Sequence, residues 1–387
     1  MKFQILFLLF GLLSCDGVSQ LTSPGIERSE DYLPLLKGQN IAVVSNHTGL
    51  RGDTHLVDYL LAQGISVKKI FSPEHGFRGD ADAGAHINNA MDSKTQLPIV
   101  SLYGNNKKPT VEQLKDIDIV VFDIQDVGVR FYTYISTLHY VMEACAQQNK
   151  PFIVLDRPNP NAYFVDGPML QPPYRSFVGM HPVPVVYGMT IGEYARMING
   201  EGWLDSSIQC ALTVVPMRNF NRQEIVSLPV APSPNLPSKQ AVALYPSLCF
   251  FEGTVVSVGR GTHLPFEIYG HPDFKDYFDF SFTPQPVQGK SANPPLKDQV
   301  CYGENLSLMP LDSIVSVKHL ELRWLINAYQ LSKDKAHFFT NYFDKLAGTD
   351  QLRQQIINGV PEAQIRASWQ GNLEKFLLVR QKYLLYE

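Results

Sequence analysis

The chain has 387 residues, of which 44% are hydrophobic and 18% charged, and its formal net charge is −4. This composition is typical of a folded globular protein and excludes both a disordered chain and a membrane-embedded one. The length predicts two domains, and the lack of basic excess argues against nucleic acid as the principal partner.

The first residues are typical of an export signal. Lys2 precedes an apolar run over residues 5–13, which is too short to span a membrane. Residues 12–15, LLSC, are similar to a bacterial lipobox, in which the cysteine becomes the lipidated N-terminus; an ordinary secretory signal is the alternative. We therefore expect a lipoprotein-type signal peptide over 1–15 and a polar tether over 16–30. The protein is then exported to the periplasm, with a lipid anchor at Cys15 as its only membrane attachment.

Strand and helix signals alternate through the first half of the chain. Strands are expected over residues 41–45, 67–71, 98–102, 117–122 and 151–155, and helices over 55–63, 110–115 and 134–148. Such apolar strands separated by helices are typical of a parallel sheet covered on both faces. The fold class is therefore α/β, with a Rossmann-like, mostly parallel sheet domain over 31–240. No Gly-x-Gly-x-x-Gly follows the first strand, so no dinucleotide or other cofactor is expected.

The second half begins with a change in composition. Proline is dense over residues 171–246, which predicts an extended, non-helical segment that crosses between domains. Beyond it we expect strand character over 249–259 and helices over 316–331, 349–358 and 361–386. We place the domain boundary near residue 240 and expect a smaller α+β domain over 241–387. The active-site cleft is expected between the two domains.

Polar side chains follow four of the predicted strands. They are Asn46 and His47; Glu74, His75 and Arg78; Asp123, Gln125, Asp126, Arg130 and Tyr132; and Asp156, Arg157 and Asn159. Loops are polar in most proteins, so one such cluster means little. In an open parallel sheet, however, ligands bind beyond the carboxyl ends of the strands. Four clusters of acids, amides and arginines therefore predict a shared site.

Residues 71–80, FSPEHGFRGD, contain the strongest candidate for a catalytic acid. Pro73 ends the preceding strand because it has no N–H for the sheet ladder. Glu74 follows Phe71 and Pro73, so we expect partial desolvation, which raises the pKa of a carboxyl group and suits a proton donor. An ion pair between Glu74 and Arg78 is the alternative, and His75 is expected to position the substrate.

The residue types narrow the reaction class. Neither a Gly-x-Ser-x-Gly elbow nor a phosphate-binding loop is present. Several carboxylates favour acid–base chemistry on an acetal or an ester, and glycoside hydrolysis needs an acid and a second anion or base. Glu74, Asp123 and Asp126 are the catalytic candidates, although Asp126 and Tyr132 also suit a helix start and a core position. Histidine spacing matches no metal-binding motif, so no metal site is expected.

Taken together, residues 45–49, 71–80, 122–133, 156–160 and 251–262 resemble the NamZ-type exo-β-N-acetylmuramidases, once described only as a domain of unknown function. The resemblance runs from about residue 30 to the C-terminus. It implies release of non-reducing terminal N-acetylmuramic acid from peptidoglycan fragments, with Glu74 as the acid and the other candidates in the pocket. The implied partner is a small-molecule substrate, a muramyl disaccharide or a muropeptide. Glu252 and Arg260 are added from the second domain.

The sugar implied by this resemblance narrows the binding roles. Asn46, Gln125 and Asp156 suit its hydroxyl groups. Its lactyl carboxylate requires a cation, for which the candidates are Arg78, Arg130, Arg157 and Arg260. Attack by the substrate's own acetamido group, oriented by Asp123 or Asp126, is an open mechanistic route. Two other functions stay open: a metal-dependent ester or phosphoester hydrolase, and a non-catalytic sugar-binding lipoprotein.

Overall fold

The structure is a computed structural model that describes residues 22–74, 76–78 and 90–387. The expected signal peptide, Cys15 and His75 lie outside the described residues. Residues 22–30, which the sequence analysis assigns to a tether, instead pack on the sheet domain. Ile26 is fully buried, and the backbone N–H of Gly25 donates to the carbonyl of Asp156 at 2.8 Å.

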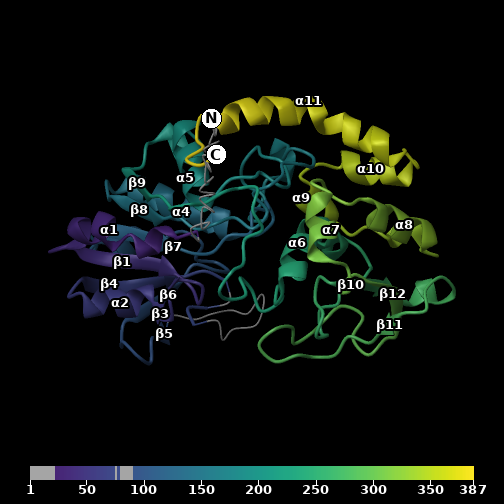
Figure 1. Cartoon of the computed structure of the whole chain (residues 1–387), viewed down its shortest axis with the longest axis horizontal. Helices are drawn as coiled ribbons and strands as arrows, with labels where there is room; N and C mark the ends of the chain where they lie inside the picture. Colours follow the sequence, from purple (N-terminus) through teal and green to yellow (C-terminus); the bar gives the residue numbers. More distant parts are fainter. Residues whose placement is uncertain (1–21, 75, 79–89) are drawn as a thin grey trace, which may run out of the picture.

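The N-terminal half forms the predicted Rossmann-like sheet (Figure 1). In the described part of the chain its order is β5-β6-β4-β1-β7-β8-β9, with every neighbouring pair parallel except β5 and β6. The bounds are β1 (Asn40–Ser45), β4 (Ser66–Ser72), β5 (Ala90–Met91), β6 (Pro98–Ser101), β7 (Ile119–Asp123), β8 (Phe152–Leu155) and β9 (Leu212–Val215). The parallel strands follow the doubly wound order 3-2-1-4-5-6, which reverses direction between β1 and β7.

Both faces of this sheet are buried, as its continuous apolar strands predict. Along β1, Ile41 and Val43 pack in one core cluster, whereas Ala42 and Val44 pack in the other. The first cluster includes residues of α1 (Ser29–Leu36) and α2 (Leu56–Ala62), and the second includes residues of α4 (Tyr134–Gln147) and α5 (Ile191–Gly200). The short helix α3 (Val111–Leu114) begins at Thr110 with a capping box, in agreement with the predicted cap.

The proline-rich segment contains more regular secondary structure than its composition predicts. Within residues 171–246 lie α5, β9 and most of α6 (Lys239–Leu248), so the expectation of a wholly extended segment is wrong. Both helices begin at side-chain caps, Thr190 for α5 and Ser238 for α6. Pro246 lies in the last turn of α6 and has no N–H for the carbonyl of Val242, which accepts from the side-chain amide of Asn161 at 3.2 Å. Residues 249–253, expected as strand, form the 3-10 helix η4 (Cys249–Gly253).

The C-terminal half is the predicted smaller α+β domain. Its sheet has the order β10-β12-β11. The bounds are β10 (Ile268–His271), β11 (Ser281–Phe282), β12 (Cys301–Asn305), α7 (Leu311–Ser316), α8 (Arg323–Leu331), α9 (Phe343–Ala347), α10 (Gln351–Ile357) and α11 (Glu362–Gln381). Helix α11 runs back toward the first domain (Figure 1). There the tail attaches, since Tyr386 donates from its hydroxyl to Asp156 at 2.6 Å.

Short elements complete the described chain. They are the hairpin β2 (Leu50–Arg51) and β3 (Thr54–His55) and the 3-10 helices η1 (Gly25–Glu27), η2 (Pro172–Tyr174), η3 (Asp205–Ser207), η5 (Pro272–Asp276) and η6 (Lys335–His337).

One buried arginine joins the two domains. The guanidinium of Arg130, fully buried, donates at 2.7–2.8 Å to the carbonyls of Pro168 and Val183 in the first domain. It also donates at 2.7–3.0 Å to those of Leu346 and Ala347 in the second. Burial lowers the pKa of Arg130 to about 9. Arg130 therefore fixes the domain orientation and is not available to a substrate, contrary to the role expected for it.

Replacing Arg130 with methionine is expected to lower the free energy of unfolding by about 3 kcal/mol or more, because four buried carbonyl groups each lose a hydrogen bond from the guanidinium. Urea denaturation followed by tryptophan fluorescence measures this change. The matched control is Arg218→Met, whose exposed ion pair with Glu30 is worth less than about 1 kcal/mol. Equal unfolding free energies for the two variants would contradict the joining role of Arg130.

Candidate active site

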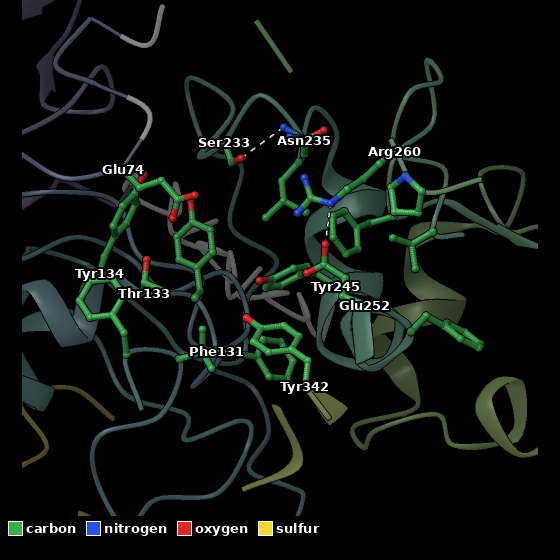
Figure 2. A pocket seen from close by; sticks show the side chains of 18 of the residues that line it. Glu74, Phe131, Thr133, Tyr134, Ser233, Asn235, Tyr245, Glu252, Arg260 and Tyr342 are labelled. Carbon is green, nitrogen blue, oxygen red and sulfur yellow. Dashed lines mark hydrogen bonds and ion pairs between the residues drawn. The ribbon is translucent and has the colours of Figure 1, made fainter. Parts of the chain in front are cut away.

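A pocket of about 430 Å³ lies between the two domains, within the size range of small-molecule sites (Figure 2). The first domain contributes residues that follow β4, β6, β7 and η2, and residues just before α6. The second contributes residues from α6 to β10, together with Pro295 and Tyr342. Four of the residues expected at the site line it: Glu74, Tyr132, Glu252 and Arg260. The pocket therefore lies beyond the carboxyl ends of the strands, as the parallel sheet predicts.

Glu74 lies on the first-domain wall among tyrosines. It follows the end of β4 at Ser72 and is partly exposed. The pKa of Tyr103 is raised to about 12, first by burial and then by the charge of Glu74 and a hydrogen bond to it. Arg78 binds other carboxylates, with its Nη2 2.8 Å from Asp92 and 3.4 Å from Asp58.

Two further tyrosines beside Glu74 are fixed by hydrogen bonds of their hydroxyl groups. The rings of Tyr132 and Tyr134 meet edge to face at 4.8 Å. Asn46 lies outside the pocket lining, but its side-chain amide donates to the Tyr134 hydroxyl at 2.9 Å. The Tyr132 hydroxyl donates to the carbonyl of Pro232 at 2.8 Å. Asn46 thus positions Tyr134 in the pocket wall. The sequence had predicted that Asn46 binds the sugar directly.

The second-domain wall carries an ion pair. Arg260 Nε donates to Glu252 Oε1 at 2.6 Å, and the guanidinium lies 5.1 Å from the centre of the Phe266 ring. In Figure 2 the guanidinium enters the pocket from the side opposite Glu74. Among the described residues, no hydrogen bond occupies the two terminal nitrogens of Arg260. Its planar fork is therefore able to take a carboxylate through two hydrogen bonds.

Asp123 and Arg157, expected in the pocket, form a buried ion pair behind it. Arg157 donates to both carboxylate oxygens of Asp123, at 2.5 and 2.9 Å, and to the carbonyl of Leu50 at 3.1 Å. Ser45, at the end of β1, donates to the Asp123 carbonyl at 2.9 Å. These bonds join the ends of β1, β7 and β8, so this pair supports the site from outside the pocket lining.

Asp126 and Asp156 are also enclosed outside the pocket lining. Asp126 accepts from the backbone N–H of Gly128 at 2.7 Å and from the hydroxyl of Tyr187. Asp156 accepts from the hydroxyls of Thr190 and Tyr386 at 2.7 and 2.6 Å. Burial raises the pKa of Asp126 to about 6 and that of Asp156 to about 7. The hydrogen bonds of these two carboxylates connect loops of the first domain and attach the C-terminal tail to it.

The remaining expected residues also hold loops together. Gln125 donates from its amide to the carbonyl of Pro158 at 2.6 Å, and Asn159 donates to that of Met189 at 2.9 Å. His47 hydrogen-bonds the carbonyl of Ala231 at 2.9 Å, and burial lowers its pKa. None of these three side chains is among the described residues that line the pocket.

Several residues that line the pocket were not predicted from the sequence. Tyr103 follows the strand β6. The expectation that ligands bind beyond the carboxyl ends of parallel strands therefore applies to Tyr103 as well. Asn235, Tyr245 and Tyr342 come from the proline-rich segment and the second domain, where no sequence signal pointed to them. In the described parts of the chain, no cluster of His, Cys, Asp and Glu is arranged to hold a metal ion. Nor is any described helix long and apolar enough to cross a membrane.

Comparison with known proteins identifies the family. The model for the N-terminal part of the exo-β-N-acetylmuramidase NamZ matches residues 41–240, and the model for its C-terminal part matches residues 243–386. This chain belongs to the NamZ family. The first of these models ends at residue 240, and the second begins at residue 243.

Individual NamZ relatives match over nearly the whole chain. The chain is 40% identical over 380 residues to the peptidoglycan β-N-acetylmuramidase NamZ of Bacillus subtilis (strain 168), covering 92% of this chain and 89% of that protein. Two DUF1343 family proteins of Bacteroides fragilis NCTC 9343 have similar crystal structures. One has a TM-score of 0.89 at 45% identity, and the other 0.78 at 29% identity; each match covers 95% of this chain and 99% of the other.

Replacing Asp123 with alanine is expected to lower the free energy of unfolding by about 3–5 kcal/mol, because the Arg157 charge stays buried without its partner. Chemical denaturation measures the loss. In the control Asp116→Ala, the lost ion pair with Lys69 involves a largely exposed carboxylate, so the change is under about 1 kcal/mol. A stable Asp123→Ala protein without activity would instead favour direct participation of Asp123 in catalysis.

Proposed function

We infer that this protein is an exo-acting β-N-acetylmuramidase, a glycoside hydrolase that releases terminal N-acetylmuramic acid from peptidoglycan fragments. The observation that carries this conclusion is the 40% identity, over 92% of the chain, to a peptidoglycan β-N-acetylmuramidase. The pocket agrees with this activity, since its walls combine a carboxylate, several tyrosines and an arginine. Such groups suit a sugar with hydroxyl, acetamido and carboxylate substituents.

We propose Glu74 as the proton donor. Of the described residues that line the pocket, Glu74 and Glu252 are the carboxylates, and Glu252 is paired with Arg260. A protonated Glu74 would transfer its proton to the glycosidic oxygen as the bond from that oxygen to the anomeric carbon breaks. The Tyr103 hydroxyl, hydrogen-bonded to Glu74, would hold the carboxyl group in place.

The position of the other carboxylates supports a substrate-assisted route. Asp123 and Asp126 are enclosed outside the pocket lining, so we do not assign them a chemical step. The acetamido oxygen of the sugar would attack the anomeric carbon as the leaving oxygen takes the proton from Glu74. Water would then open the resulting oxazolinium ring and return a proton to Glu74, which restores the enzyme. A covalent sugar trapped on a protein carboxylate would contradict this route.

Glu74→Gln is expected to lower release of N-acetylmuramic acid by at least about 100-fold, because the amide cannot donate the proton that general acid catalysis requires. Mass spectrometry of the products formed from N-acetylmuramyl-N-acetylglucosamine measures the rate. The matched control is Glu112→Gln on the exposed face of α3, which should retain full activity. Near wild-type turnover in Glu74→Gln, with an unchanged melting temperature, would remove Glu74 from the mechanism.

We propose that Arg260 binds the lactyl carboxylate. The other candidate cations are committed elsewhere: Arg78 to two aspartates, Arg130 to backbone carbonyls and Arg157 to Asp123. Arg260 lies on the pocket wall, where Glu252 holds Nε and leaves the terminal nitrogens for the ligand. In this proposal the terminal sugar would lie between Arg260 and Glu74.

Arg260→Gln is expected to raise KM for a muramyl substrate about 10- to 100-fold, the loss that corresponds to hydrogen bonds with a charged group. The measurement compares 4-nitrophenyl β-glycosides of N-acetylmuramic acid and N-acetylglucosamine, and selectivity for the first should fall. Arg323→Gln, an exposed arginine of the same domain, is the control. Equal loss on both glycosides would argue against recognition of the lactyl group by Arg260.

The substrate class locates the enzyme in the cell envelope, where peptidoglycan lies. We propose that it is exported as a lipoprotein, anchored through Cys15, and faces the periplasm. The support is the apolar segment followed by LLSC at residues 12–15.

A further inference from the structure

Next to Glu74, the pocket continues into a group of half-buried aromatic residues. We call the rings of Tyr103, Tyr140 and Phe177, together with the neighbouring Lys107, the aromatic shelf. Tyr103 and Phe177 line the pocket, whereas Lys107 and Tyr140 do not, so the shelf extends beyond it. Phe177 is at its centre, with its ring 6.5 Å from that of Tyr103 and 6.3 Å from that of Tyr140, centre to centre.

The shelf is built from three separate segments of the first domain. Tyr103 and Lys107 follow β6, Tyr140 belongs to α4, and Phe177 lies after η2. The rings of Tyr140 and Phe177 are nearly parallel, at 16°, and Ser136 of α4 donates to the Phe177 carbonyl at 2.7 Å. Each shelf residue keeps part of its surface accessible, and none belongs to the buried core. Partly exposed rings that continue a pocket are typical of a binding surface.

We propose that the aromatic shelf binds the leaving part of the glycan chain, a β-1,4-linked segment of alternating N-acetylglucosamine and N-acetylmuramic acid. This inference rests on the proposed function. Glu74 must face the glycosidic oxygen between the terminal sugar and the next one. Arg260 enters the pocket from the side opposite Glu74 (Figure 2). The rest of the chain would therefore leave past Glu74 and Tyr103, which is hydrogen-bonded to Glu74. The C–H faces of pyranose rings pack on aromatic rings, and the three rings of the shelf are partly exposed.

The charge of Lys107 fits the same occupant. Its Nζ lies 4.8 Å from the centre of the Phe177 ring. The next residue, Lys108, pairs with Glu143, whereas Lys107 forms no ion pair with any residue that the structure describes. In an alternating chain, the second sugar of the leaving part is again N-acetylmuramic acid, which carries a lactyl carboxylate. Lys107 is placed to attract that carboxylate when no stem peptide is attached. A disaccharide substrate lacks this second N-acetylmuramic acid and so has no second lactyl carboxylate for Lys107 to attract.

The test is the wild-type preference for a longer chain. We compare kcat/KM for the first release of N-acetylmuramic acid from the tetrasaccharide (N-acetylmuramyl-N-acetylglucosamine)₂ and from the disaccharide. The tetrasaccharide should be preferred about threefold or more. Lys107→Gln and Tyr140→Leu should each bring this ratio toward one, by about threefold, the size of a partly exposed ionic or aromatic contact. Since both rates come from the same preparation, a lower folded fraction leaves the ratio unchanged.

The control Lys115→Gln makes the same charge change on the exposed α3 region and should keep the wild-type ratio. A wild-type ratio of one, or an unchanged ratio in both shelf variants, would overturn the inference. Lack of N-acetylmuramic acid release from either substrate by the wild-type enzyme would instead overturn the proposed function.

Discussion

The geometry of the active site depends on how one buried guanidinium holds two domains together. Arg130 follows β7, so its backbone belongs to the first domain, yet half of its hydrogen bonds end on the carbonyls that finish α9. Gly348 allows this approach, because a Cβ at that position would lie 2.6 Å from Arg130 Nη2, and its φ of +74° favours glycine. Since Glu74 and Arg260 come from different domains, their relative position follows from this joint.

A second level of support lies behind the pocket wall. The pair of Asp123 and Arg157 ties neighbouring strand ends, and the Asp156 carboxylate ties the C-terminal tail to the end of β8. Such buried polar groups are costly unless every partner is in place, so they favour one arrangement of the loops. The residues that meet the substrate can then be few, because the enclosed residues keep them in position.

Much of the first domain could be predicted from sequence because its signals are local. The five expected strands appear within two residues of their predicted bounds, and Thr110 caps its helix as its chemistry predicts. Helices α5 and α6 could not be predicted in this way. Their caps, Thr190 and Ser238, lie in a stretch whose many prolines disfavour helix formation. The short β10, β11 and β12 gave no usable pattern because pairing between distant segments creates them.

By itself, the sequence determined the class of fold, the family and the edge of the sheet where the site lies, because apolar periodicity and strand-end motifs are local properties. It also singled out Glu74, whose position after Pro73 is visible in the chain. Only the tertiary structure decided which polar residues face the pocket. The direction and burial of a side chain depend on segments far away in sequence. For this reason Asp123, Asp126 and Arg130 are buried outside the pocket lining, whereas Glu252 and Arg260 line the pocket.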